Sequence, residues 1–185
     1  MIDTHTHLYL PEFQTDIEEV LKRAQAAGIT QCWIPGIDAD SLRAMDRLYN
    51  LMPAPGFFRL FAGLHPCEVK NNFREELSLI RSALLSGKYD GIGEIGLDRH
   101  WDLSFFEEQL EALRTQLDWA LEFNLPVLIH TRDAFEQMMP IIRPYYDKGL
   151  KGIFHSFAGT LEQALELTKE GGFYLGINGS ITYKN

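Results

Sequence analysis

Short apolar runs alternate with amphipathic stretches along the whole chain. Seven of these runs are bounded by turn residues, as expected of parallel strands that are buried on both faces. They lie near Met1 to Thr4, Gln31 to Ile37, Arg59 to Leu64, Gly91 to Leu97, Pro126 to Thr131, Gly152 to Phe154 and Phe173 to Asn178. The stretches between them have the spacing of surface helices.

Four of the intervening stretches begin with helix start signals. In each, Ser, Thr or Asp is followed three residues later by Glu or Gln, which is the pattern of a capping box or a close relative. The pairs are Thr15 with Glu18, Ser104 with Glu107, Asp133 with Glu136, and Thr160 with Gln163. The first helix is predicted to stop at Gly28 and the longest to run from Ser104 to Asn124. Pro140 predicts a kink or a short helix after Asp133.

This alternation of strands and helices predicts an α/β fold with a parallel sheet, either open and doubly wound or closed as a (β/α)₈ TIM barrel. No GxGxxG or P-loop motif follows the first strand, where a nucleotide-binding open sheet would carry one. Ionisable residues instead follow the carboxyl ends of several different strands, which is where barrels build their active sites. These residues are His5, His7, His65, Glu94, Asp98, His130 and His155. The pattern therefore favours the barrel.

Composition limits the class of protein. Of the 185 residues, 45% are hydrophobic and 12% aromatic, so the chain can bury a core and is not disordered. We expect one domain over residues 1–185. No apolar run reaches the about 18 residues of a transmembrane helix. The formal net charge of −9 argues against a broad basic face, so an anionic substrate must be held by a local positive centre.

The cysteines and the amino terminus indicate a compartment. Cys32 and Cys67 form no CxxC pair, so neither a disulfide framework nor a cysteine zinc site is expected, and a reducing environment is the default. No basic segment followed by an apolar segment opens the sequence, as a signal peptide would. We therefore expect a cytoplasmic protein, and nothing in the sequence indicates an obligate protein partner.

The histidines carry the candidate chemistry. His5 and His7 point to the same side of a strand, about 6 to 7 Å apart, and can converge on one divalent ion. A carboxylate such as Glu94 in a buried strand is costly unless it is paired, hydrogen-bonded or bound to a metal. His130 and His155 end two further apolar runs. Each residue alone is more often a core or capping residue than a ligand.

Taken together, four imidazoles and one carboxylate exceed what a single tetrahedral ion needs. This inventory indicates two divalent ions that share Glu94 as a bridging ligand. Such a pair activates water and stabilises both the attacking and the leaving oxygen of a displacement. The chemistry suits hydrolysis of phosphate esters, and it also suits amides.

Six motifs occur in an order and spacing that resemble the TatD family of metal-dependent deoxyribonucleases. They are MIDTHTHL at the start, GLHP (63–66), GEIGLD (93–98), PVLIHTRDA (126–134), FHSFAG (154–159) and GINGSITYKN (176–185). The resemblance extends over residues 1–185. It implies a (β/α)₈ barrel of the metal-dependent hydrolase type, two divalent ions of the Mg, Mn or Zn kind, and hydrolysis of DNA phosphodiester bonds, often from an end.

The resemblance also assigns residues. It implies that the metal ligands are His5, His7, Glu94, His130 and His155, with Glu94 also catalytic, and that His65 faces substrate phosphate. Arg132 is a weaker candidate for a phosphate contact, since Arg offers bidentate donors to phosphoryl oxygens.

Several of these residues have other interpretations. His65 can instead cap the turn before Pro66, and Arg132 can pair with Asp133 or Asp98. Asp98 can orient a ligand imidazole or cap the loop that follows it. In that loop, His100 and Trp101 can offer a stacking face to a base.

The strand count departs from the family pattern. A barrel has eight strands and typically about 250 residues, so we expect a barrel truncated after about seven strands, with the edges of the first and seventh exposed. The resemblance implies that the absent strand carries an aspartate that binds metal and helps to deprotonate water. Two alternatives to a deoxyribonuclease therefore stay open: an amidohydrolase or lactonase on the same barrel, and an inactive fragment or scaffold.

Overall fold

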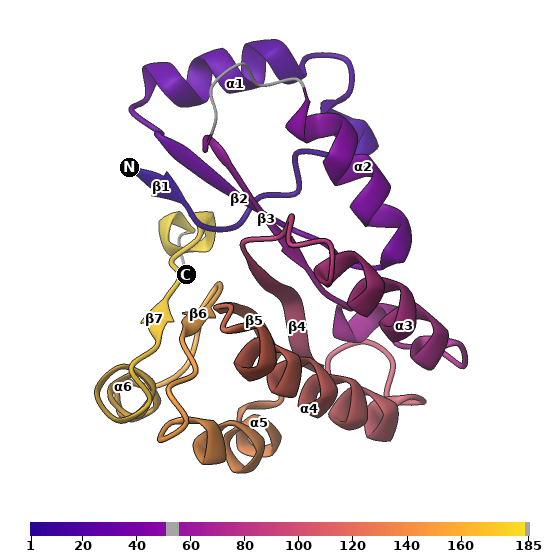
Figure 1. The fold of residues 1–185 in the computed structure, drawn as a ribbon. Coiled ribbons are helices and arrows are strands. Elements are labelled where there is room, and N and C mark those ends of the chain that lie inside the picture. The colour runs from indigo at the N-terminus through magenta and orange to yellow at the C-terminus, as the bar shows by residue number, and fades with distance from the viewer. Residues whose placement is uncertain (51–55, 184–185) are drawn as a thin grey trace.

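Seven parallel strands lie side by side in chain order in the computed structural model, which describes residues 1–50 and 56–183. The strands are β1 (Ile2–Asp3), β2 (Gln31–Pro35), β3 (Phe58–Ala62), β4 (Gly91–Asp98), β5 (Val127–Arg132), β6 (Gly152–Phe154) and β7 (Tyr174–Leu175). Figure 1 shows the sheet curled, with the helices on its outer side. The seven predicted strands are confirmed, and the fold is a (β/α) barrel truncated after the seventh strand.

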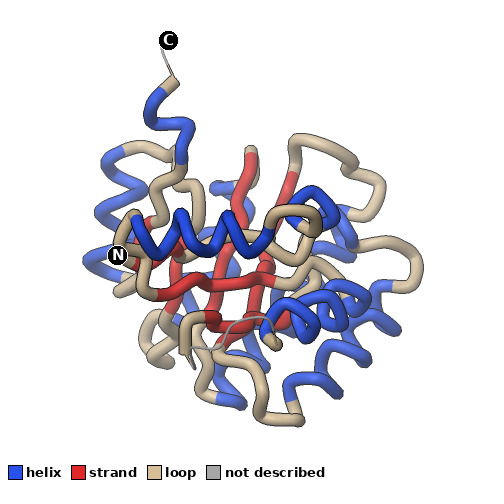
Figure 2. The backbone as a smooth tube through the Cα atoms, turned by 90° about the horizontal axis from the view of Figure 1, so that it is seen from above, coloured by secondary structure: helices blue, strands red, loops and turns tan. Residues whose placement is uncertain are grey.

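Helices follow the strands and cover the outer face of the sheet, as the view from above shows (Figure 2). They are α1 (Ile17–Ala26), α2 (Ala39–Tyr49), α3 (Phe73–Leu84), α4 (Phe106–Phe123), α5 (Phe135–Ile142) and α6 (Leu161–Leu165). A π-helical turn (Glu166–Glu170) continues α6, and short 3₁₀ segments lie at Pro11–Phe13, Pro66–Glu68, Arg143–Tyr145 and Gly179–Thr182. Within the described residues, none of these helices is long and apolar enough to cross a membrane.

A helix begins within two residues of each of the four predicted start signals, but a capping box forms at only one of them. Thr160 and Gln163 form the expected capping box before α6. Asp133 does not begin α5, because its backbone is left-handed (φ 53°) and its carboxylate faces His100. Asp102 accepts the N–H of Ser104 in a turn, and α4 begins only at Phe106.

The remaining helix ends also differ in detail. Asp16 rather than Thr15 occupies the position before α1, and its side chain makes no capping hydrogen bond. At the other end of the helix, Gly28 lies in the left-handed turn (φ +83°) that follows α1. α5 is a short helix of eight residues, as predicted, and it continues through Pro140 to Ile142. An unpredicted capping box begins α2, where the Asp38 carboxylate accepts the N–H of Ser41.

The core lies on both sides of the sheet. Between the sheet and the helices lies the large cluster that includes Ile34, Leu60, Val127 and Ile129. A smaller cluster of Phe61, Leu128 and Ile153, with Trp33 packed against it, occupies the inner side. Residues two apart on a strand share a face. Leu128 therefore lies below His130, and Ile153 lies below His155. The inner side chains thus form a floor under the candidate site.

β4 is buried along its whole length and approaches its neighbours closely. Gly96 lies opposite His130 in β5, with a φ of +150°, and a Cβ there would lie 1.9 Å from the His130 carbonyl oxygen. The β4–β5 register also shifts between Ile92 and Ile95. Glu94 lies inside this shift, so its side chain is presented from an irregular stretch of the strand.

β1 and β7 are the two edges of the sheet. A groove of about 500 Å³ runs between the segments that contain them, lined by Ile2, Asp3, Gly176 and Ile177 among others. Ile2 and Ile177 are exposed, at 50% and 78%. The two edges therefore face one another across a groove and remain unpaired within the described residues, as the strand count predicted.

Candidate metal centre

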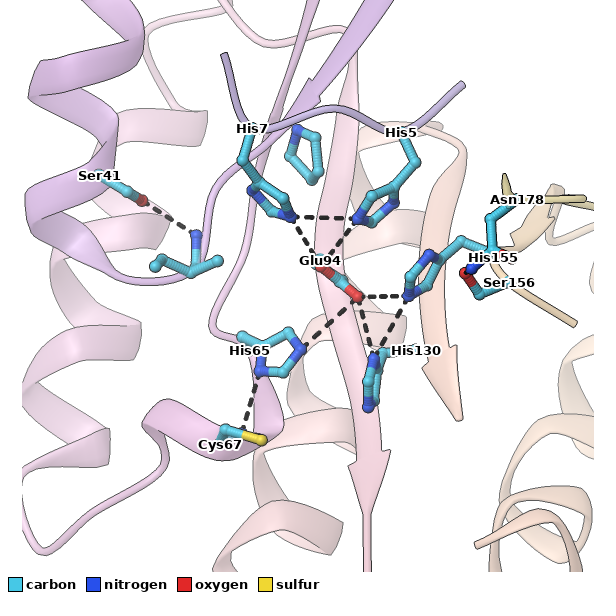
Figure 3. A network of polar contacts seen from close by, with 12 residues as sticks. His5, His7, Ser41, His65, Cys67, Glu94, His130, His155, Ser156 and Asn178 are labelled. Carbon is cyan, nitrogen blue, oxygen red and sulfur yellow. Dashed lines mark hydrogen bonds and ion pairs between the residues drawn. The ribbon is translucent and has the colours of Figure 1, made fainter. Parts of the chain in front are cut away.

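Five imidazoles surround the carboxylate of Glu94 at the carboxyl ends of the strands (Figure 3). Glu94 and His130 lie in β4 and β5 themselves. The other four imidazole-bearing positions follow strands: His5 and His7 come after β1, His65 after β3 and His155 after β6. The structure thus brings together every residue that the sequence predicted as a metal ligand, with His65 beside them.

One oxygen of Glu94 faces the amino-terminal pair. Oε2 lies 3.1 Å from Nε2 of His5 and 3.4 Å from Nε2 of His7. The two nitrogens are themselves 3.1 Å apart. These three donor atoms therefore form a small triangle.

The other oxygen faces the carboxyl-terminal pair. Oε1 of Glu94 lies 3.1 Å from Nδ1 of His130 and 2.8 Å from Nε2 of His155. These two nitrogens are 3.3 Å apart. The His155 ring also stacks on that of His5, with centroids 3.8 Å apart, which places the two triangles side by side.

Both triangles fit a divalent metal. Ligands at 2.0–2.2 Å from a tetrahedral Zn²⁺ lie about 3.3 to 3.6 Å from one another, and octahedral ligands lie about 3.0 Å apart. Nitrogen and carboxylate donors are also the types that Zn²⁺ and its neighbours bind. The donor set, with one Glu94 oxygen in each triangle, is therefore suited to hold one ion on either side of the carboxylate.

Hydrogen bonds on the far side of the rings fix which nitrogen is free. The Tyr9 hydroxyl donates to the Pro35 carbonyl, 3.0 Å away, so it accepts from Nδ1–H of His7 at 2.9 Å. Nε2 of a neutral His7 then carries a lone pair toward Glu94. Similarly, when His130 is neutral, its Nε2–H donates to Asp98 at 2.9 Å, which leaves the lone pair on Nδ1. In their neutral states both rings therefore have the tautomer that a metal ligand requires.

His65 is held in the opposite form. Its Nδ1 accepts the backbone N–H of Cys67 at 3.1 Å, which caps the 3₁₀ segment after it. A neutral ring then carries its hydrogen on Nε2, which lies 3.5 Å from Oε1 of Glu94. The predicted capping interaction thus exists, and it leaves an N–H donor facing the site rather than a lone pair.

The charge states suit the same purpose. Burial would raise the pKa of the Glu94 carboxyl, but hydrogen bonds from the surrounding imidazoles, His130 first, lower it well below its usual range. Burial lowers the pKa of His5. For His130, burial would lower the pKa, but the bonds to Glu94 and Asp98 raise it. An ionised Glu94 and a neutral His5 are the states that bind metal, while His130 must release a proton to do so.

One ring nitrogen has no protein partner. Nδ1 of His5 is buried and makes no hydrogen bond to any described residue. The usual support of a ligand imidazole is therefore present at His7 and His130 and absent at His5.

The residues around the centre depart in part from the sequence interpretation. Arg132 pairs with neither Asp133 nor Asp98 in the described part of the chain, because Asp133 faces His100 and Asp98 faces His130. Its guanidinium carbon lies 5.2 Å from the ring centroid of Trp101 instead. Asp98 does both things considered for it, since it orients His130 and accepts the N–H groups of His100 and Trp101.

Sequence reasoning did not find Tyr9. It lies in a turn two residues after His7, so the two-residue period of a strand does not describe its position and gave no signal. Its partner, the Pro35 carbonyl, comes from β2 and has no sequence signal.

Comparisons with known proteins identify the family of the chain. The family model described as TatD related DNase matches residues 2–185. The "Uncharacterized metal-dependent hydrolase YabD" of Bacillus subtilis (strain 168) is 37% identical over 186 residues, which cover 100% of this chain and 71% of that protein. The "3'-5' ssDNA/RNA exonuclease TatD" of Pantoea vagans (strain C9-1) is 34% identical, covering 97% of this chain and 68% of that one.

A solved structure agrees as well. The crystal structure of YJJV, a TatD homologue from Escherichia coli K12, superposes with a TM-score of 0.89 at 30% identity, covering 99% of this chain and 70% of that one. The family model thus matches residues 2–185, and the superposition covers nearly all of this chain. The chain belongs to the TatD family of metal-dependent hydrolases.

Proposed function

We propose that residues 1–185 act as one hydrolase domain whose centre cleaves phosphodiester bonds of DNA from a strand end. Two divalent ions, of the Mg, Mn or Zn kind, would be held by His5, His7, Glu94, His130 and His155. When bound, such ions supply an activated water near neutral pH and positive charge for phosphoryl oxygens. The preference for nucleic acid is drawn from the names of the TatD relatives.

The observation that carries this proposal is the position of Glu94 between two triangles of donors. Each carboxylate oxygen faces its own pair of imidazoles. Removing water from a carboxylate is costly unless it is paired or bound to a metal, and here the side chain of Glu94 is only 3% exposed. A bridging ligand is the role that uses both oxygens.

Two residues would act on the substrate directly. Nε2–H of His65 is a donor that faces the centre, which suits a non-bridging oxygen of the scissile phosphate. Arg132 carries a full charge and makes no ion pair with a described carboxylate, so its N–H groups are available to a phosphate. The chain has a net charge of −9, so local donors such as these would hold the phosphate in place of a broad basic surface.

Metal stoichiometry tests the centre first. Elemental analysis of the purified chain after equilibration with Mn²⁺ or Zn²⁺ should give two ions per molecule. Glu94→Gln should lose at least one, because an amide cannot bridge two cations as a carboxylate does. Glu111→Gln is the matched control, since Glu111 is exposed on α4 and pairs with Arg74. Full occupancy in the Glu94 variant would overturn the bridging role.

An oligonucleotide assay tests the substrate. A single-stranded DNA labelled at one end should be shortened stepwise by the metal-loaded chain and by Glu111→Gln, but not by Glu94→Gln. A lactone and an N-acyl amide serve as competing substrates, because the same centre can hydrolyse both. Turnover of either one, with an intact oligonucleotide, would replace the nuclease by an amidohydrolase or lactonase.

A further inference from the structure

Trp101 is exposed beside the centre. Its side chain is 68% accessible, whereas Trp119 is 8% accessible and Trp33 stacks on Phe61. Trp101 lies in the loop that follows β4, the strand of Glu94. An indole left in water is a candidate contact for a partner or a ligand with a flat apolar face.

The loop that carries Trp101 is fixed to the centre by one carboxylate. Oδ1 of Asp98 accepts the N–H groups of His100 and Trp101, at 2.8 and 3.2 Å. Oδ2 of the same residue holds His130 at 2.9 Å. The His100 ring packs edge-on against the indole, with centroids 4.8 Å apart. The indole is therefore placed relative to the metal centre rather than on a free loop.

Arg132 joins this loop to the strand that carries His130. It lies two residues after His130 in β5, on the same side of the strand and about 7 Å along it. Its guanidinium carbon is 5.2 Å from the centroid of the indole. Guanidinium and indole planes both stack on nucleobases. A single nucleotide can span the distance of about 7 Å between His130 and Arg132 along the strand.

The groove beside the centre has a mixed charge. It measures about 840 Å³ and is lined by His130, Arg132 and His155, and by the charged side chains Arg99, Asp133 and Glu136. Two arginines are thus offset by two carboxylates, one of which faces His100. Such a groove is poorly suited to bind a long phosphate backbone by charge alone. Stacking supplies a further kind of contact: Trp101 does not itself line this groove, but its indole lies against Arg132, which does.

We propose that Trp101 and Arg132 form a nucleobase-binding platform that stacks on one base next to the phosphate held at the metal centre. The inference rests on the proposed function, since a base reaches this position only if a nucleic acid is the substrate. Because every base has a π-face, the platform selects a base that is free to leave its neighbours rather than one base type.

Binding of phosphorothioate-linked single-stranded DNA pentamers, which resist hydrolysis, tests this platform by fluorescence anisotropy. One probe carries a base at every position, and a matched probe has an abasic site at its terminal nucleotide. Trp101→Ala should weaken binding of the first probe by about 5- to 150-fold, whereas Trp101→Phe should retain most of the affinity. The abasic probe should bind equally to the wild-type chain and to Trp101→Ala.

Two controls separate the possible failures. Tyr174→Ala removes another exposed aromatic ring, 72% accessible, at the start of β7, and should leave binding unchanged. Metal occupancy should be the same in all variants. Unchanged affinity of Trp101→Ala for the base-containing probe, an equal loss of affinity for both probes, or a loss of bound metal in that variant would overturn the platform while leaving the nuclease in place. No binding of either probe by the wild-type chain would overturn the proposed function, and the platform with it.

Discussion

The hydroxyl oxygen of Tyr9 lies 2.9 Å from Nδ1 of His7. A hydroxyl has one hydrogen, and that of Tyr9 is donated to the carbonyl of Pro35. Burial raises the pKa of Tyr9, so the hydroxyl stays protonated at neutral pH. It therefore accepts from His7 and keeps the lone pair of that imidazole on Nε2.

Replacing Tyr9 by Phe should release this constraint. The ring of His7 would then populate both tautomers and rotate more freely, and we expect metal affinity to fall by about 10- to 100-fold. Competition with a chromophoric chelator at pH 7 measures this loss. Tyr145→Phe is the matched control, because its hydroxyl donates to Asp118 on α4, and it should leave metal binding unaltered. Unchanged affinity in Tyr9→Phe would show that the tautomer is set by other contacts.

Asp98→Asn should act through His130. The amide would offer an N–H to Nε2 of the imidazole, which moves the ring hydrogen to Nδ1, the atom that faces Glu94. We expect a loss of metal affinity of about 10- to 100-fold with little change in the fold, because the amide oxygen can still accept the N–H groups of His100 and Trp101. Isothermal titration with Mn²⁺ checks this, with Asp118→Asn as control. A variant that binds metal normally would limit Asp98 to holding the loop.

The two thiols should be unreactive in the folded chain. Burial raises the pKa of Cys32 to about 11 and that of Cys67 to about 12, where Asp98 adds to the shift. Unfolded thiols ionise near pH 8.5. The contribution to stability is therefore complete below about pH 8.5 and is lost as the pH rises toward the folded values. Mass spectrometry after iodoacetamide treatment at pH 8 should find no label without urea and two labels with it. Rapid native labelling would contradict the shifts.

Gly96→Ala should be among the most damaging small substitutions. The new methyl carbon would lie 1.9 Å from the His130 carbonyl oxygen, on a backbone with a φ of +150°. We expect a loss of more than about 3 kcal/mol in the free energy of unfolding. The midpoint of urea unfolding measures this loss. Gly179→Ala is the control, since a Cβ there meets nothing within 4 Å. Equal midpoints would mean that β4 and β5 can separate at little cost.

The sequence was informative where chemistry depends on spacing along the chain. The HxH spacing of His5 and His7 and the apolar run that ends at His130 identified these three residues without a structure, although His5 and His7 lie just after β1 rather than in it. The form of His7 was not predictable, because it depends on Tyr9 and, through its hydroxyl, on the Pro35 carbonyl of another strand. The contact that sets the form of His65 is local, and capping by this residue was one of the two interpretations considered.

The helix start signals were less informative for a similar reason. Ser104 and Asp133 are residue types that cap helices, and each is followed three residues later by Glu. Their backbone or side-chain groups, however, hydrogen-bond to other partners. Asp102 takes the N–H of Ser104, and His100 takes the carboxylate of Asp133. Of the four predicted start residues, Thr160 is the one that caps a helix, and its backbone there is extended.

The stacking of His5 on His155 joins the first strand to the sixth across most of the chain. Contacts of such long range form late in folding, because the chain entropy of closing a large loop must be lost before they are made. The donor atoms are thus scattered until the sheet has curled. Ions held by both triangles would link the segment after β1 to the segment after β6, so full occupancy of the centre reports that the sheet has curled.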